Sequence, residues 1–389
     1  MINIKDKTKC SGCHACYNSC PSHCISMNKD EEGFLYPAID QKECLNCGLC
    51  EKVCPFLDSR KRSEPTEAWA AKCTDEKLRF ESSSGGIFSL LAIKVLNSGG
   101  IVFGAAFSAD FKEVYHTSVT HCEDLKKLRT SKYVQSAIGE SYREVKELLD
   151  EGKDVLFSGV PCQITGLKKY LKKEYDNLVC VDVICHGVPS PELWKKYLDC
   201  IEKKHRGVIT DINFRHKKIS WQNFGISRTS DGVDIFTPAG SDPYMQMFLR
   251  NYALRPSCFA CQTKTNGSDS DITLGDFWGI DCVLPKMNDG KGVSAVIVHT
   301  EKGKRLYNAI AECIEQQAVP YDSVKKYNSP IFQSVAKPEE RDLFFMDLNR
   351  LSFDELAEKY CKPLRKSVKQ RLAGTKLWKK LRLLIRGGG

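Results

Sequence analysis

Compact apolar runs alternate with amphipathic segments through the middle of this chain. The runs have the length of strands, and the segments between them repeat their apolar residues at helical spacing. Strands are predicted at residues 101–107, 113–120, 154–162 and 178–187. Helices are predicted at residues 86–100, 123–133, 139–152, 164–175 and 191–205. This alternation predicts an α/β layer architecture in which part of the sheet is parallel.

The pattern changes after the last of these helices. Residues 208–237 contain short alternating runs in succession, which predict consecutive antiparallel strands. Residues 294–300 are apolar again and precede a helical pattern that begins at about residue 301. We therefore expect the fold class to be α/β, or α+β over the whole chain, built on a mixed sheet.

Charge is distributed unevenly along the 389 residues. The net charge is +9, but residues 362–389 hold ten Lys and Arg and no acidic residue, so the remaining chain sums to about −1. A near-neutral body gives little support to nucleic-acid binding. The tail at residues 365–389 mixes Leu, Val, Trp and Ile with its basic residues. It suits an amphipathic helix on anionic lipid and, equally, a terminal helix that is solvated or bound to a partner.

Twenty cysteines are unusual for a chain of this length. The opening MINIKDKTKC is polar and no long apolar stretch follows, so neither a secretory signal nor a transmembrane helix is expected. In a reducing cytosol, clustered cysteines serve as metal or redox ligands rather than as disulfides. We therefore expect a cytoplasmic protein, with peripheral contact at the inner face of the membrane if the tail binds lipid.

The motif C-x2-C-x2-C-x3-C-P occurs twice near the N-terminus, at residues 10–21 and 44–55. This is the ligand pattern of bacterial two-cluster ferredoxins, in which the fourth cysteine of each run binds the other cluster. It predicts two [4Fe–4S] clusters in a self-contained module of about 57 residues. One is held by Cys10, Cys13, Cys16 and Cys54, and the other by Cys20, Cys44, Cys47 and Cys50. A pair of zinc sites is the alternative, because C-x2-C is also a zinc spacing, and Cys24 lies outside the motif as a spare thiol.

Four further cysteines lie where α/β proteins usually bind ligands. Cys162 and Cys185 each follow a predicted strand, and Cys258 and Cys261 form another C-x2-C. Neighbouring strand ends open into one crevice, and a loop folded over it would complete a set of four thiolates. A third [4Fe–4S] cluster is the leading interpretation, with a zinc site or unrelated thiols as alternatives. A Cys185–His186 nucleophile is disfavoured, because adjacent residues of an extended segment point to opposite sides.

Two polar segments have the composition of cofactor contacts. ESSSGG, at residues 81–86, precedes an apolar helix, where backbone N–H groups and hydroxyls bind phosphate well. An ordinary N-cap with a flexible turn is the alternative. RTSKYVQS, at residues 129–136, offers Lys132, Tyr133 and Gln135 for a pyrophosphate or a ring. Neither the dinucleotide fingerprint nor the P-loop motif occurs.

Taken in order, SSSGG, KYVQS, SGVPCQITGL, DVICHGVPSPELW, CFAC and DITLGDFWG resemble the coenzyme F420 hydrogenase/dehydrogenase beta-subunit family. The resemblance runs from about Glu67 to the 320s, and an N-terminal dicluster ferredoxin is a common fusion partner in that family. It implies an FAD-dependent oxidoreductase with a [4Fe–4S] cluster beside the flavin. The implied ligands of that cluster are Cys162, Cys185, Cys258 and Cys261. The implied flavin contacts are Ser83, Ser84, Gly85, Gly86, Lys132, Tyr133, Val134 and Gln135.

The resemblance also divides the chain. It implies a ferredoxin domain at residues 1–57, a linker at 58–67, and the N-terminal-like domain of the family at 68–150. The C-terminal-like domain would follow at 151–345, and a C-terminal helix with the basic tail at 346–389.

Relatives within this family use the flavin to convert a hydride of the deazaflavin coenzyme F420 into single electrons, or the reverse. Others reduce chlorophyll-type tetrapyrroles, and some are encoded among surface-polysaccharide genes. The implied function is electron transfer between a redox partner protein or low-potential donor and a small-molecule substrate such as F420. One alternative is a non-catalytic electron-transfer subunit that feeds a partner enzyme, including one of polysaccharide synthesis. Another is a protein whose clusters are structural or sensory. No catalytic residue is predicted.

Overall fold

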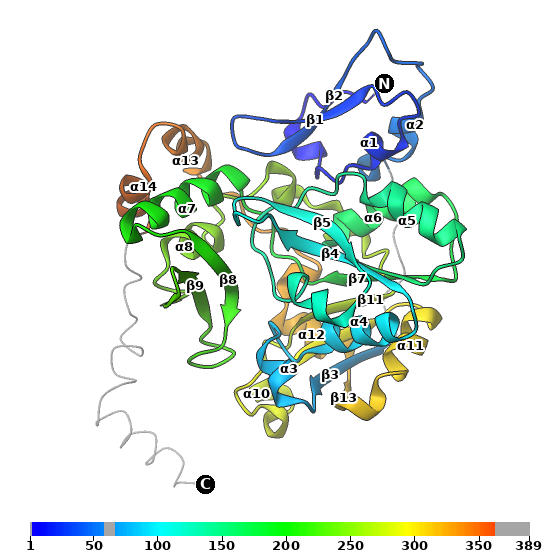
Figure 1. Ribbon diagram of the computed structural model, residues 1–389, viewed down its shortest axis with the longest axis vertical. Helices are drawn as coiled ribbons and strands as arrows, with labels where there is room; N and C mark the ends of the chain where they lie inside the picture. The colour runs from blue at the N-terminus through cyan, green and yellow to red at the C-terminus, as the bar shows by residue number, and fades with distance from the viewer. Residues whose placement is uncertain (1, 58–66, 362–389) are drawn as a thin grey trace.

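An eight-stranded mixed sheet forms the centre of the protein, in a computed structural model that describes residues 2–57 and 67–361 (Figure 1). The strand order is β13-β3-β12-β11-β7-β6-β4-β5. The bounds are β3 Glu67–Cys73, β4 Ile101–Phe107, β5 Val114–Val119, β6 Val155–Gly159, β7 Leu178–Val183, β11 Ile272–Asp276, β12 Ser294–Val298 and β13 Ile314–Val319. Strands β11, β7, β6 and β4 are parallel, and the outer strands are antiparallel. The predicted mixed sheet is confirmed.

Helices cover both faces of this sheet. They are α3 Glu76–Phe80, α4 Ile87–Asn97, α5 Ser141–Asp150, α6 Pro161–Leu171 and α11 Glu301–Asn308. Leu91 of α4 packs on Leu156 at one face, and Ile164 of α6 packs with Phe157 at the other. Leu156 and Phe157 are consecutive in β6 and point to opposite faces. Because both faces are buried, the parallel strands are mostly apolar rather than alternating.

A second lobe with an aromatic core packs beside the sheet. It contains α7 Pro191–His205, β8 Ile209–His216, β9 Gly225–Ser230, β10 Val233–Pro238, α8 Pro243–Leu249, α13 Arg341–Leu348 and α14 Phe353–Tyr360. The strands form an antiparallel sheet in the order β10-β9-β8, as the pattern of residues 208–237 predicts. Trp194, Tyr197, Phe214 and Tyr244 fill the core between this sheet and the helices. Three short helices complete the body, α9 Gln262–Asn266, α10 Ile280–Val283 and α12 Tyr321–Tyr327.

The N-terminal module has a small core of its own, around Cys16, Cys20, Cys24 and Ile25, and it also contributes residues to two cores of the body. It consists of α1 Ala15–Ser19, the antiparallel pair β1 Ile25–Lys29 and β2 Leu35–Ile39, and α2 Leu49–Lys52. Phe34 is buried in the aromatic core of the second lobe, whereas Cys13 and Ala15 belong to the core beneath α6. Figure 1 shows the module lying along the end of the body that carries α5 and α6. These shared cores fix the module on the body.

One predicted helix is shorter than expected. In place of a helix at residues 123–133, the structure has a 3-10 helix at Cys122–Lys127 followed by an irregular segment. Thr130 has a φ of 64°, in the left-handed region. The Lys132 Nζ donates hydrogen bonds to the carbonyl oxygens of Arg129 and Thr130, at 2.7 and 3.3 Å. These carbonyls therefore bond to an ammonium group, and the helix does not continue.

Within the described residues, no helix has both the length and the apolar character needed to cross a membrane. The basic tail at residues 362–389 lies outside the described residues. The amphipathic helix and the peripheral membrane contact expected of it stay predictions.

We expect Gly166→Val to weaken the packing of the N-terminal module on α6. A Cβ at residue 166 would lie 3.0 Å from both the Cys13 Cβ and the Tyr142 Oη, so one of them would have to move. Overpacking of this kind lowers the free energy of unfolding by about 1–3 kcal/mol. The measurement is the thermal unfolding midpoint of anaerobically prepared protein. Gly240→Val is the control, since nothing lies within 4 Å of a Cβ there, and equal midpoints would contradict the packing.

Candidate functional site

Each predicted set of module cysteines surrounds a cavity of its own. The first cavity is lined by Cys10, Cys13, Cys16 and Cys54, together with Ser11 and Phe56. The second is lined by Cys20, Cys44, Cys47 and Cys50. Helix α1 carries Cys16 toward the first cavity and ends just before Cys20, which lies in the second. The structure therefore brings together the two sets that the repeated motif predicts.

Cys24 also lines the second cavity, although its place outside the motif suggested a spare thiol. It is buried, and its Sγ lies 3.4 Å from the Cys20 Sγ. The motif could not indicate this contact, because it depends on how the chain turns between α1 and β1.

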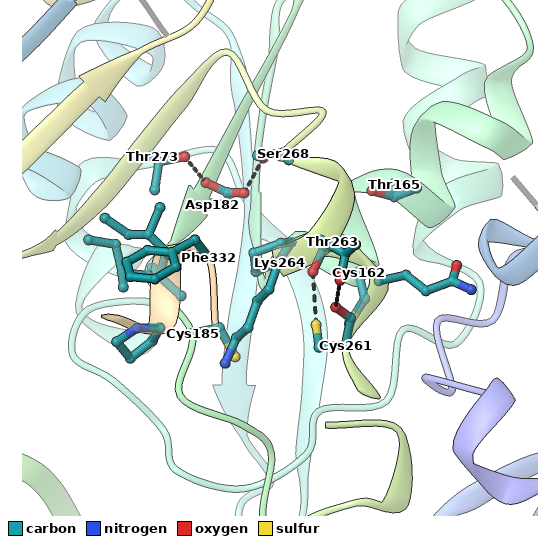
Figure 2. A pocket seen from close by; sticks show the side chains of 18 of the residues that line it. Cys162, Thr165, Asp182, Cys185, Cys261, Thr263, Lys264, Ser268, Thr273 and Phe332 are labelled. Atoms are coloured by element: carbon teal, nitrogen blue, oxygen red, sulfur yellow. Dashed lines mark hydrogen bonds between the residues drawn. The ribbon is translucent and has the colours of Figure 1, made fainter. Parts of the chain in front are cut away.

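The other four predicted ligand cysteines meet at the carboxyl edge of the sheet. Strands β6 and β7 are parallel neighbours, so Cys162 at the start of α6 and Cys185 just after β7 emerge side by side. The 3-10 helix Pro256–Ala260 carries Cys258, and Cys261 follows it. All four line one cavity of 340 Å³ (Figure 2), which we call the third cavity. Among the described residues, no three His, Cys, Asp or Glu side chains converge on one point as a single metal ion requires.

Burial controls the chemistry of these thiols. Desolvation, followed by the nearby cysteines, raises the pKa of Cys185 to about 12 and that of Cys258 to about 11. These thiols are protonated at neutral pH, so a metal centre would have to displace their protons. The Val188 N–H donates to the Cys258 Sγ at 3.4 Å, and the Thr263 Oγ1 lies 3.1 Å from the Cys261 Sγ. Hydrogen bonds of this kind stabilise a thiolate.

The imidazole of His186 is hydrogen-bonded to Asn251. Its Nε2 lies 2.7 Å from the Asn251 Oδ1. Burial also lowers its pKa. The geometry therefore supports the interpretation that disfavoured a Cys185–His186 nucleophile.

A buried polar network that the sequence did not indicate lies on the wall of the third cavity. Asp182, at 0% exposure, accepts hydrogen bonds from the Ser268 hydroxyl and from the Thr273 Oγ1, the latter at 2.5 Å (Figure 2). The Thr273 Oγ1 lies 2.8 Å from the His299 Nε2. Burial raises the pKa of Asp182 to about 6 and lowers that of His299 to about 4. In the sequence Asp182 is simply one residue of an apolar run, which is why it was missed.

A cavity of 590 Å³, which we call the large cavity, adjoins the third cavity. Cys162 and Cys185 line both. The large cavity is also lined by seven of the eight predicted flavin contacts, namely Ser83, Ser84, Gly86, Lys132, Tyr133, Val134 and Gln135. Gly85 is the exception, because its N–H donates to the Ser294 Oγ at 2.9 Å and a Cβ there would meet the Ala71 carbonyl oxygen at 2.5 Å. Gly85 therefore serves close packing behind the loop.

The two predicted cofactor segments are bound to each other. The Ser131 N–H donates to the Ser83 Oγ at 2.8 Å. Gly86 has a φ of 87° and precedes α4, and no side chain caps that helix. The Lys217 Nζ donates to the Ser84 carbonyl oxygen at 2.6 Å and holds the loop from behind. An ordinary N-cap does not describe this loop.

The large cavity contains positive charge. Desolvation lowers the pKa of Lys132 to about 7. Arg215 also lines the cavity and forms an ion pair with Asp276 at 2.6 Å. Trp278, 37% exposed, lines it as well and stacks on Trp221 with ring centroids 5.4 Å apart. Arg215 was not predicted, and only the DITLGDFWG motif pointed toward Trp278.

Family models match both parts of the chain. One describes the C terminus of the coenzyme F420 hydrogenase/dehydrogenase beta subunit and matches residues 152–324, and one described as "4Fe-4S dicluster domain" matches residues 9–57. The protein thus belongs to the class of iron–sulfur electron-transfer proteins related to oxidoreductases. It carries the C-terminal domain of the coenzyme F420 hydrogenase/dehydrogenase beta-subunit family behind a dicluster ferredoxin domain, as the resemblance implied.

Individual relatives are distant. The chain is 27% identical over 322 residues to the coenzyme F420-dependent sulfite reductase of Methanocaldococcus jannaschii, covering 80% of this chain and 47% of that protein, so it spans about half of that relative. It is 22% identical over 352 residues to one subunit of the F(420)H(2) dehydrogenase of Methanosarcina mazei, covering 84% and 92%. A chain of the F420-reducing [NiFe] hydrogenase complex from Methanosarcina barkeri superposes with a TM-score of 0.45 at 17% identity, covering 81% of this chain and 94% of that one.

We expect Cys20, and not Cys24, to be required for iron in the second cavity. Both thiols line that cavity, but only Cys20 belongs to the ferredoxin motif. Cys20→Ser should therefore lose about four irons per chain, whereas Cys24→Ser should keep the wild-type iron content. The measurement is iron and acid-labile sulfide per chain after anaerobic purification. If Cys24→Ser loses iron and Cys20→Ser keeps its full iron content, then Cys24 is the ligand and the prediction is wrong.

Proposed function

We propose that this protein is an FAD- and [4Fe–4S]-dependent oxidoreductase that passes electrons between its clusters and a small-molecule substrate. Two clusters belong to the dicluster module, and a third belongs in the third cavity, held by Cys162, Cys185, Cys258 and Cys261. FAD belongs in the large cavity. The observation that carries this proposal is the shared wall of the two cavities, which contains Cys162 and Cys185.

The residues present suit these groups. Four thiols around a cavity of 340 Å³ suit a polynuclear cluster better than a single zinc ion, which needs four donors at one point. The large cavity, at 590 Å³, has the size and mixed lining of a cofactor site. It combines aromatic and hydroxyl side chains with the Lys132 ammonium, which supplies charge for an anionic cofactor.

Bound FAD would supply the conversion between one-electron and two-electron chemistry that iron–sulfur clusters lack. The residues of the chain contribute position and electrostatics. The Ser83–Ser131 hydrogen bond and Lys217 hold the loop that precedes α4. His116 lines the large cavity, and burial lowers its pKa to about 4, so its imidazole is neutral at physiological pH. Its Nε2 lies 3.1 Å from the Ser158 carbonyl oxygen, which fixes the ring.

A deazaflavin of the F420 type is the first candidate substrate, because the two relatives above are named for that coenzyme. The half-exposed indole of Trp278, supported from behind by Trp221, offers a flat apolar face to a planar ring at the cavity wall. A redox partner protein would exchange electrons with the module.

The alternative from another class is a non-catalytic subunit that only passes electrons to a partner enzyme. One of the relatives is named as a single subunit of a dehydrogenase, which is in keeping with this alternative. The two functions differ in whether the isolated chain turns over. Reduction of F420 by the purified chain with a chemical one-electron donor supports the enzyme, and full cofactor content without turnover of any donor or acceptor supports the electron-transfer role.

We expect about twelve irons per chain in anaerobically purified protein, at four per [4Fe–4S] cluster. Cys185→Ser should contain about eight, because it removes one ligand of the third cluster and leaves the module intact. Cys282→Ser is the matched control, since Cys282 is exposed and lies outside every ligand set. Iron, sulfide and zinc would be measured together. Eight irons per chain in the wild type, or one zinc per chain, would contradict the proposed third cluster.

We expect Lys132→Met to weaken FAD binding at least about tenfold, the effect of one charge-assisted hydrogen bond. The pKa of Lys132, about 7 in the free protein, should rise when an anionic group binds. Wild-type affinity should therefore be full below pH 7 and fall as the pH rises above 7, whereas the variant should show no such dependence. The measurement is flavin rebinding between pH 6 and 9, followed by fluorescence.

Lys196→Met is the control for this variant. Lys196 also donates to two backbone carbonyl oxygens, those of Leu348 and Leu351, but it does not line the large cavity. It should bind FAD like the wild type at every pH. A wild-type pH profile in Lys132→Met would show that Lys132 does not contact the cofactor. Substitution of Gly86 is a poorer test, because its positive φ strains any other residue.

A further inference from the structure

Arg255 lies at the junction of the N-terminal module and the body. It precedes the 3-10 helix Pro256–Ala260, three residues before Cys258, and its exposure is 0%. It lines the third cavity. A guanidinium group buried this completely needs hydrogen-bond acceptors and a compensating negative charge.

The guanidinium of Arg255 contacts three segments that are distant in the sequence. Its Nε donates to the Cys10 carbonyl oxygen at 2.7 Å, and its Nη2 lies 3.6 Å from the Cys10 Sγ. The Nη2 also donates to the Leu35 carbonyl oxygen at 3.0 Å. The Nη1 donates to the Gln135 Oε1 at 3.0 Å, and the group lies over the Tyr36 ring at 4.1 Å. Arg255 therefore connects the loop of the first cavity with the segment that lines the large cavity.

These contacts satisfy the N–H groups of Arg255, but they do not neutralise its positive charge. No carboxylate of residues 2–57 and 67–361 forms an ion pair with it in the structure. Arg341 is a useful contrast, because it is buried to 3% exposure at the same junction and forms a bidentate pair with Glu32, at 2.9 and 2.6 Å. The acidic group that the guanidinium contacts directly is the Cys10 thiol, which is a thiolate when it binds a cluster. The charge of Arg255 also acts, without a hydrogen bond, on the Cys258 thiol of the third cavity.

Three cavities meet beside this side chain, at Ser11. Ser11 lines the first, the third and the large cavity. The Gln135 Nε2 donates to the Ser11 carbonyl oxygen at 3.2 Å. A Cβ at Gly12 would lie 2.8 Å from the Gln135 Nε2 and 2.9 Å from the Arg255 Nη1, so the backbone approaches these groups as closely as glycine permits. The positive charge of Arg255 is thus held at one defined place.

We propose that Arg255 is a positioning residue that raises the reduction potential of the cluster held by Cys10 above that of the cluster held by Cys20. Reduction adds one negative charge to a cluster, and a cation with an N–H aimed at a ligand sulfur stabilises the reduced form. The step it favours moves one electron from the reduced Cys20-set cluster to the oxidised Cys10-set cluster, with no bond made or broken. The electron then lies beside the third cavity.

This inference rests on the proposed relay, and its test measures potentials rather than turnover. The holoprotein would be titrated electrochemically under anaerobic conditions, with each cluster followed by electron paramagnetic resonance. Arg255→Gln removes the charge and should shift the one-electron equilibrium of the Cys10-set cluster toward the oxidised form by at least about tenfold, which is 59 mV. Arg255→Lys keeps a charge but lacks the fork, so its shift should be smaller.

Glu32→Gln is the matched control, since it breaks the carboxylate pair across the same junction and touches no sulfur. It should leave all cluster potentials at their wild-type values. Wild-type potentials in Arg255→Gln with full iron content overturn the inference, and so does an equal shift in Glu32→Gln. If the wild-type protein contains neither a third cluster nor flavin, the proposed function is wrong. That conclusion does not depend on the potential of the Cys10-set cluster.

Discussion

The parallel alignment of β11, β7, β6 and β4 is the constraint on which the candidate sites depend. Strands that run in one direction end at one edge, so the residues that follow β6 and β7 emerge together. Cys162 and Cys185 are those residues, and Asp276 ends β11 at the same edge. The antiparallel β12 begins there, which is why Ser294 can accept a hydrogen bond from Gly85. Because both sheet faces are buried, this edge is rigid, and the side chains of a site at the edge are held in fixed positions.

The loops over this edge lack regular hydrogen-bonding partners, and buried cations replace them. The Lys217 Nζ donates to the carbonyl oxygens of Arg79, Ser84 and Lys291, at 2.7, 2.6 and 3.0 Å. Burial and the nearby Arg79 charge lower the pKa of Lys217 to about 7, so this anchor weakens when the group loses its proton. Arg255 likewise donates hydrogen bonds to the Cys10 loop, and its guanidinium group stays charged. Lys217 contacts only backbone carbonyl oxygens, whereas Arg255 also faces the Cys10 thiol.

The metal-site cysteines could be predicted because their signal is local or topological. The spacing of the module cysteines is set by the geometry of a cluster, and Cys162 and Cys185 follow from the rule that parallel strands share an edge. Arg255, Lys217 and Asp182 could not be predicted, since each acts through residues more than eighty positions away. The helix wrongly predicted at residues 123–133 fails for a different, local reason. Its periodicity is helical, but the ammonium of Lys132 takes the carbonyls that a helix would use.

The cavities differ in access to solvent, and this difference orders the proposed relay. The second cavity lies outermost, with Cys47 exposed and Leu45 exposed to 68%. The first cavity lies against α6, where Cys13 closely approaches Gly166, and it shares Ser11 with the third and large cavities. In the proposed relay, a redox partner would approach the Cys20-set cluster, and a small molecule would react in the large cavity, which Cys185 and Lys132 both line. Because residues of the module pack into two cores of the body, the distance between these two ends is set by the fold and not by a hinge.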